Sequence, residues 1–187
     1  MIDKSVAEKM KEEMVAFMGP KAENVDPEMI QLSVELGDKL AKGEIRLADA
    51  LSIPKEKLNI MYAIAYDLYD NNKYEKAVNI FNMLCLYDPL NTDYWQGLGA
   101  TQKLLKKYEL AALAYSTLIQ LRNTQMAYYL DLAECLLQME RIEDAKKCLQ
   151  GILSIGESNE LKNHGTNCEA YVQRAKALLA LLEKKSK

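Results

Sequence analysis

The chain has 187 residues, 49% of them hydrophobic, which suits one domain with or without an added arm. Its 24 Lys and Arg residues and 27 Asp and Glu residues give a net charge of −3, which argues against a nucleic-acid-binding protein, because such proteins usually carry a basic patch. No stretch approaches the roughly 20 apolar residues of a membrane span. The N-terminus also lacks the apolar run of a signal peptide, so we expect a cytoplasmic protein without membrane insertion.

An N-terminal helical arm is expected over residues 1–53. Residues 3–18 have the pattern of one amphipathic helix, and Asp26-Pro27-Glu28 predicts the start of a second, which ends near Gly43. The apolar residues of the two helices, which we expect to mediate dimerisation, are Val6, Met10, Met14, Phe17, Ile30 and Val34. An amphipathic arm without its own core usually finds a partner surface. The alternative is that the arm folds back on the groove or the convex face of its own chain.

Residues 54–159 carry an internal repeat, in which similar residues recur at one constant offset along the chain. Small residues recur at two places in the repeat: Ala65, Gly99 and Ala133, then Ala77, Ala111 and Ala145. This interval, about 34 residues with small side chains at fixed places, is the period of the tetratricopeptide pattern, a helix–turn–helix unit. The sequence therefore predicts an all-α fold, a tetratricopeptide-repeat superhelix of three units at about 58–91, 92–125 and 126–159.

Large residues recur at the same interval and are expected to fill the core between the helices. They are Met61, Trp95 and Tyr129; Ile64, Leu98 and Leu132; and Phe81, Tyr115 and Leu149. Residues 160–187 are expected to form a C-terminal capping helix, because an apolar stripe runs from Cys168 to Leu182 and a capping-box sequence precedes it. That helix should lie against the third repeat.

The candidate residues for chemistry are few. The cysteines form no Cys-x-x-Cys pair and their spacing matches no zinc motif, and His164 is the one histidine. No nucleophile–base set and no glycine-rich phosphate loop can be assembled from the sequence. We therefore expect a binding protein, not an enzyme, with no cofactor and no metal.

The expected binding surface is the concave face, which the first helix of each tetratricopeptide unit lines. The inward positions hold Asn59, Tyr62, Tyr66, Tyr69 and Asp70; Asp93, Gln96, Ala100, Lys103 and Leu104; and Ala127, Leu130, Glu134, Leu137 and Gln138. The three tyrosines follow one another at helical spacing, so their rings should share one helical face. Such a face suits the proline or leucine side chains of an extended peptide. The alternative is that these tyrosines are core residues covered by the preceding helix.

Several motifs resemble the class II chaperones of type III secretion systems, which serve translocator proteins. The matching motifs are Tyr62-x-x-x-Tyr66-x-x-Tyr69, Tyr74-Glu75-x-Ala77, Leu98-Gly99-Ala100, Tyr108-Glu109-Leu110-Ala111 and Ala133-Glu134-Cys135-Leu136-Leu137-Gln138. The resemblance covers about residues 30–155. It implies a bacterial cytoplasmic chaperone without ATPase activity that holds hydrophobic, pore-forming translocators before export.

The same resemblance implies that the groove binds an extended client segment bearing spaced prolines and a leucine. Aromatic residues of the first repeat would form the pocket, which places Tyr62, Tyr66 and Tyr69 there. It also implies dimerisation through the N-terminal helices, as in several members, although the long arm of this chain departs from the family pattern. From the residues themselves, we expect Leu104, Leu130 and Leu137 to continue an apolar floor.

Two other peptide-binding functions are alternatives. A clamp for the C-terminal carboxylate of a heat-shock chaperone needs Lys, Arg and Asn at inward positions. Those places here hold Tyr62, Tyr66, Gln96, Ala127 and Leu130, so the clamp is absent. A scaffold or regulatory adaptor for another peptide stays open, because a fold does not fix a function.

Overall fold

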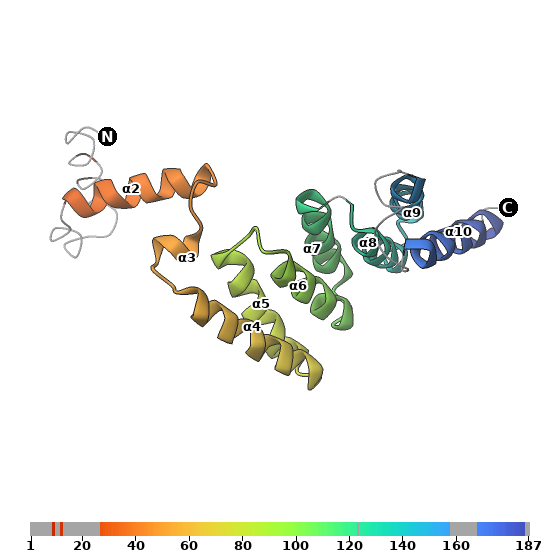
Figure 1. Ribbon diagram of the computed structural model, residues 1–187, viewed down its shortest axis with the longest axis horizontal. Helices are drawn as coiled ribbons and strands as arrows, with labels where there is room; N and C mark the ends of the chain where they lie inside the picture. The colour runs from red at the N-terminus through yellow and green to blue at the C-terminus, as the bar shows by residue number, and fades with distance from the viewer. Residues whose placement is uncertain (1–8, 10–11, 13–26, 123, 158–167, 186–187) are drawn as a thin grey trace. The chain divides into compact units, whose positions relative to one another are not determined.

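The computed structural model describes residues 9, 12, 27–122, 124–157 and 168–185 (Figure 1). Within these ranges the regular secondary structure is helical and there is no strand, which confirms the all-α prediction. The chain divides into two compact units, Met1–Pro54 and Lys55–Lys187.

The first unit contains the helices α2 (Pro27–Ala41) and α3 (Leu47–Ala50). Gly43 follows α2 with φ of 70°, a left-handed conformation that glycine adopts without steric cost, and so ends the helix where the sequence predicts. Of the residues predicted to mediate dimerisation, Val6, Met10, Met14 and Phe17 lie outside the described residues. Ile30 and Val34 belong to α2, but their side chains lie outside what the structure describes.

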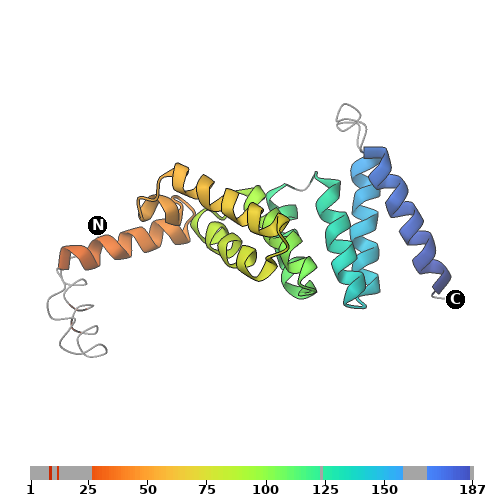
Figure 2. The same ribbon diagram turned by 90° about the horizontal axis from the view of Figure 1, so that it is seen from below.

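The second unit consists of three helix pairs and a final helix. The pairs are α4 (Lys55–Asp70) with α5 (Tyr74–Tyr87), α6 (Thr92–Leu104) with α7 (Tyr108–Leu121), and α8 (Met126–Gln138) with α9 (Ile142–Glu157). Each helix packs against the next in the chain, as Figures 1 and 2 show. The last helix, α10 (Cys168–Lys185), packs against α9 and also contacts α8, the place expected of a capping helix.

The turn between the two helices of each pair repeats the period of the sequence in its backbone. Asn72, Lys106 and Glu140 occupy the same position of the three repeats, and they have φ of 59°, 58° and 58°. In each turn the next backbone N–H, that of Lys73, Lys107 or Arg141, donates to a carbonyl near the end of the preceding helix. Only Asn72 is a residue type that readily adopts this left-handed conformation. The repeat therefore fixes the turn geometry even where the local residue does not favour it.

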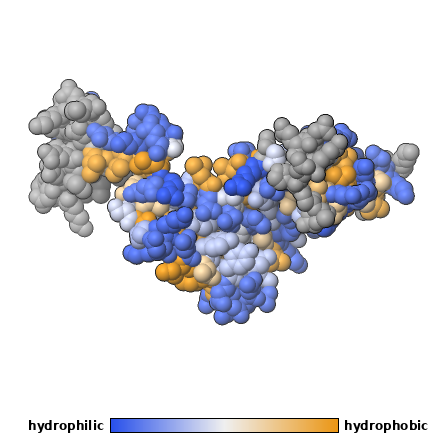
Figure 3. Space-filling model, in the orientation of Figure 1, coloured by the Kyte–Doolittle hydropathy of each residue, from blue (hydrophilic) through white to orange (hydrophobic). Residues whose placement is uncertain are grey.

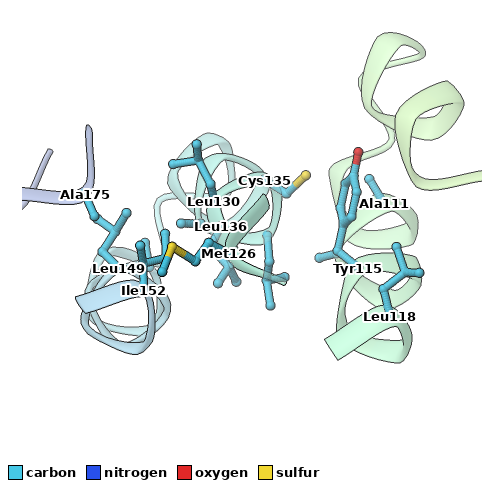
Figure 4. Close-up of a cluster of buried hydrophobic side chains, with 14 residues drawn as sticks. Ala111, Tyr115, Leu118, Met126, Leu130, Cys135, Leu136, Leu149, Ile152 and Ala175 are labelled. Atoms are coloured by element: carbon cyan, nitrogen blue, oxygen red, sulfur yellow. The ribbon is translucent and has the colours of Figure 1, made fainter. Parts of the chain in front are cut away.

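The core confirms the role of the small repeated residues. Ala65, Ala133, Ala77, Ala111 and Ala145 have no exposed surface, and Gly99 is also buried. A Cβ on Gly99 would lie 3.0 Å from Cζ of Tyr115, so this position brings α6 close to α7. Figure 4 shows Tyr115 of α7 on one side of the α8 residues, and Leu149 and Ile152 of α9, with Ala175 of α10 beside them, on the other.

One predicted core residue is wrong. Ile64 is 47% exposed, whereas its repeat equivalents Leu98 and Leu132 are buried. The helices α6 and α8 each follow a complete pair that covers them, but α4 opens the unit and has no earlier repeat on that side. The same sequence position therefore faces solvent in the first repeat.

A close contact at Gly97 leads to a stability prediction. A Cβ there would overlap the ring of Phe81, which is fully buried. We expect Gly97→Ala to lower the free energy of unfolding by about 2 kcal/mol, because overpacking outweighs the better helix propensity of alanine. Urea unfolding measures the change.

The matched control for this substitution is Gly37→Ala. Gly37 lies in α2, and a Cβ there would have nothing within 4 Å. It should be neutral or stabilise the chain by up to about 1 kcal/mol. An unchanged stability of Gly97→Ala would show that α5 and α6 are not packed this closely.

Candidate peptide-binding surface

A row of three tyrosine rings runs along α4. The ring centroids of Tyr62 and Tyr66 are 5.4 Å apart, and those of Tyr66 and Tyr69 are 6.1 Å apart. Tyr66 is 45% exposed, and its two neighbours are half-buried. The predicted sharing of one helical face is therefore confirmed, and the rings offer an open aromatic surface in the second unit.

Other aromatic rings support this row from α5 and α6. The ring of Phe81 is edge-on to Tyr62 and Tyr66, with centroid distances of 6.2 and 6.5 Å. The ring centroid of Tyr94 lies 5.5 Å from that of Tyr62, and the ring centroid of Tyr74 lies 5.7 Å from that of Tyr69. Edge-to-face and tilted pairs at these distances are favourable. The tyrosine row therefore packs against other rings on one side and is open to solvent on the other. This arrangement is intermediate between the two alternatives from the sequence, an open binding face and a covered core.

The supporting rings are not among the predicted site residues. The sequence predicts Phe81 only as a repeat-core residue and indicates no packing role for Tyr94 or Tyr74. Gly97 was the feature of the sequence that could have indicated these rings. It lies two places before the repeat residue Gly99, and a residue without Cβ leaves room for a ring from the neighbouring helix. That ring is Phe81.

Partial burial changes the ionisation of the tyrosine row. Burial, followed by the nearby Tyr66 and Asp93, raises the pKa of Tyr62 from 10.0 to about 12. A raised folded-state pKa means that the neutral ring is favoured in the folded protein. Its contribution to stability is complete below pH 10 and is lost as the pH rises towards about 12.

We therefore expect Tyr62→Phe, which cannot ionise, to lose less stability than the wild type between pH 10 and about 12. Urea midpoints measured across this range give the comparison. Since other tyrosines ionise in both proteins, the difference isolates Tyr62. Parallel curves would show that Tyr62 is as exposed to solvent as a free tyrosine.

Beyond the tyrosine row, a charge network joins α6, α8 and α10. The Nζ of Lys103 donates to Asp131 Oδ1 at 2.6 Å and to Glu134 Oε2 at 2.9 Å, and the Nη2 of Arg174 donates to Glu134 Oε1 at 2.6 Å. Burial alone would lower the pKa of Lys103, but the hydrogen bonds to the two carboxylates and their charges raise it to about 12. Two positive and two negative groups thus balance, and the ion pair between Arg174 and Glu134 links the capping helix to α8.

The remaining predicted groove residues are placed less uniformly. Those on open or half-open surface are Asn59, Asp93, Gln96, Ala100, Lys103, Leu104, Glu134 and Leu137. The prediction that Leu130 forms part of an open apolar floor is wrong, because this residue is only 5% exposed and belongs to the core cluster. The reason is that the third repeat has α10 beyond it and fills this position with core packing. Asp131 and Arg174 join the network without having been predicted.

The described residues offer little for other chemistry. They contain no group of three or more His, Cys, Asp or Glu residues that could hold a metal ion. The cysteines are free, and burial raises the pKa of the Cys85 thiol to about 12 and that of Cys135 to about 11. Over the same residues, none of the helices has the length and apolar character needed to cross a membrane.

Comparison with known proteins identifies relatives of this chain. The Tetratricopeptide repeat family matches residues 58–91. Chaperone protein SicA of Salmonella typhimurium is 31% identical over 135 residues, which cover 72% of this chain and 74% of SicA. The type III secretion chaperone SycD of Yersinia enterocolitica, solved with a peptide of the translocator YopD, is 27% identical with a TM-score of 0.55, over 67% of this chain and 96% of SycD.

The chain belongs to the class II translocator chaperones of type III secretion systems. A further similar structure is the chaperone PcrH of Pseudomonas aeruginosa in complex with the chaperone-binding region of PopD. It is 25% identical, with a TM-score of 0.63, over 72% of this chaperone and 97% of PcrH.

Proposed function

We propose that this chaperone binds an extended segment of a type III translocator on the surface that the tyrosine row opens, and keeps that client soluble and competent for export. The chaperone would act in the bacterial cytoplasm, by binding its client without catalysis. The observation that carries the proposal is the tyrosine row itself, exposed at Tyr66 and supported from below by a buried phenylalanine. The structures of PcrH and SycD with segments of PopD and YopD support it.

The geometry suits an extended ligand with apolar side chains. Each tyrosine contacts the next, so the row is a continuous strip that runs along one helix. Rigid aromatic side chains lose little conformational entropy on binding, which leaves more of the contact energy for affinity. Proline and leucine side chains of the client would lie between the rings.

The charge network limits which client groups can bind beside α6 and α8. Lys103 and Glu134 both occupy predicted groove positions, and in the free chaperone they pair with each other. A charged client group at this place would have to replace an existing partner, whereas a neutral segment would leave the network intact. We therefore propose that the bound segment is uncharged where it passes α6 and α8.

Co-expression tests this function. The translocator of the same bacterium should stay in the soluble fraction and co-purify with the wild-type chaperone. The variant with Tyr62, Tyr66 and Tyr69 changed to alanine should leave it in the pellet. Equal solubility of the translocator with both proteins, or without either, would contradict the proposal.

We also propose that the free chaperone is a homodimer through residues 1–42, which carry Val6, Met10, Met14, Phe17, Ile30 and Val34. The sequence predicts an amphipathic arm here, and such an arm without its own core usually finds a partner surface. Sedimentation should show a dimer for the full chain and a monomer for a chain that starts at Asp26. Identical monomer masses at high concentration would reject the dimer.

A further inference from the structure

A second apolar surface lies on the other side of α6 from the predicted groove residues. A pocket of about 500 Å³ opens between α5, α6 and α7, lined mainly by Cys85, Leu86, Leu98, Gln102, Leu110 and Leu113. On α6 the lining residues follow a spacing of three and four, from Trp95 to Leu98 and Gln102, so they form one stripe of the helix. The groove residues Gln96, Ala100 and Lys103 form a different stripe.

The rim of this pocket exposes leucines and carries no charge. Leu86, Leu110 and Leu113 are 64%, 49% and 62% exposed. The segments 77–87 of α5 and 110–121 of α7 contain no Asp, Glu, Lys or Arg. On the face that Figure 3 presents, hydrophobic patches alternate with hydrophilic side chains. Exposed apolar groups gathered at a concave site mark an interaction surface.

The repeat provides an internal comparison that shows the fold does not require these leucines. In the same register, the third repeat has Asp144 where the second has Leu110, and Lys147 where the second has Leu113. Asp144 and Lys147 are solvated and pair with each other across 3.1 Å. A tetratricopeptide unit therefore folds with charges at both places, and the second unit has leucines for another reason.

A buried polar group in the same pocket is a second indication that the pocket binds a partner. Gln102 is 5% exposed, and its Oε1 has no hydrogen-bond partner. The equivalent residues of the flanking repeats are Leu68 and Leu136, so a leucine satisfies the fold at this position. A buried acceptor without a donor costs free energy, which a donor from outside would recover. The three departures of the second repeat, at Gln102, Leu110 and Leu113, meet in one pocket.

We propose that this pocket is a second docking site, for the apolar face of an amphipathic helix from a protein partner that donates one hydrogen bond to Gln102 Oε1. A helix fits because the site is a furrow between two helices, α5 and α7, with α6 as its floor, and side-chain ridges of a helix pack into such furrows. The uncharged rim selects a partner face without charges. The tyrosine row and this pocket use different stripes of α6, so both can be occupied at once.

The test is a selection with random peptides of about 15 residues, roughly four helical turns. Phage that display them are bound to the wild-type chaperone and depleted on the double variant Leu110→Asp/Leu113→Lys, which carries the residues of the third repeat. Enriched peptides should have apolar residues at helical spacing with a hydrogen-bond donor among them. Their circular dichroism should become helical on binding.

The affinities of the enriched peptides decide the outcome. They should fall at least tenfold for Leu110→Asp/Leu113→Lys and for Leu86→Ser, the residue of the third repeat at that place, and several-fold for Gln102→Leu. They should be unchanged for Tyr66→Ala, and all variants should keep wild-type helicity. No enrichment that depends on these leucines, peptides that bind in extended form, or peptides lost with Tyr66→Ala would each overturn the second site.

Discussion

Replacing Phe81 by alanine should destabilise the chaperone by about 3–5 kcal/mol, the usual range for deletion of a fully buried phenylalanine ring. Its side chain has no exposed surface and lies against the backbone of Gly97. Because glycine offers no side chain to fill the space, the cavity would not collapse easily. Urea unfolding followed by circular dichroism measures the loss.

The same substitution should weaken client binding, because the rings of Tyr62 and Tyr66 rest edge-on against Phe81. Leu86→Ala is the control on the same helix, since the side chain of Leu86 is mostly exposed and its truncation should cost little stability. A loss below about 1 kcal/mol for Phe81→Ala would mean that the site under the tyrosine row is not packed as described.

Replacing Tyr66 by alanine should weaken binding of the translocator segment by about 2 kcal/mol, close to a thirtyfold rise in Kd. Tyr66 is the most exposed ring of the row and touches both neighbours, so it offers the largest free surface to a ligand. Its exposure also means that the helical fold should survive the substitution. Calorimetry on the folded protein gives the affinity.

Two further variants interpret that result. Tyr66→Phe keeps the ring and should bind within a few-fold of the wild type if the apolar face of the ring carries the affinity. Glu143→Ala should bind like the wild type, because Glu143 is exposed on α9 and its salt bridge is to Lys146 of its own helix. A Tyr66→Ala variant that binds as well as Glu143→Ala would remove the tyrosine row from the site.

The repeat architecture could be predicted from the sequence because each repeated contact needs the same kind of residue. Two helices can approach closely only at a small side chain, and so Ala65, Gly99 and Ala133 record the contact directly. The spacing of the tyrosines likewise determines that they share a face. The first inference depends on a contact that every repeat makes, and the second on the geometry of a single helix.

The features that escaped prediction depend on contacts between elements. Arg174 lies on α10, outside the repeats, so its salt bridge to Glu134 has no periodic signal. Leu130 occupies an inward position of the repeat, but the third unit uses that position for its core. Ile64 shows the opposite case, a core position left exposed where no repeat precedes. The repeat pattern therefore does not predict the environment of residues in the first and last repeats, or the ion pairs between helices.

The most direct measurement is calorimetry of the translocator's chaperone-binding segment, as a synthetic peptide, with the wild-type chaperone and with the variant in which Tyr62, Tyr66 and Tyr69 are alanine. Both proteins should first show the same helical circular dichroism. The wild type should bind one segment per chain, and the variant should bind it at least a hundredfold more weakly, since three neighbouring anchors are lost. Equal affinity of the two folded proteins for the segment would contradict the assignment of the tyrosine row as the client site.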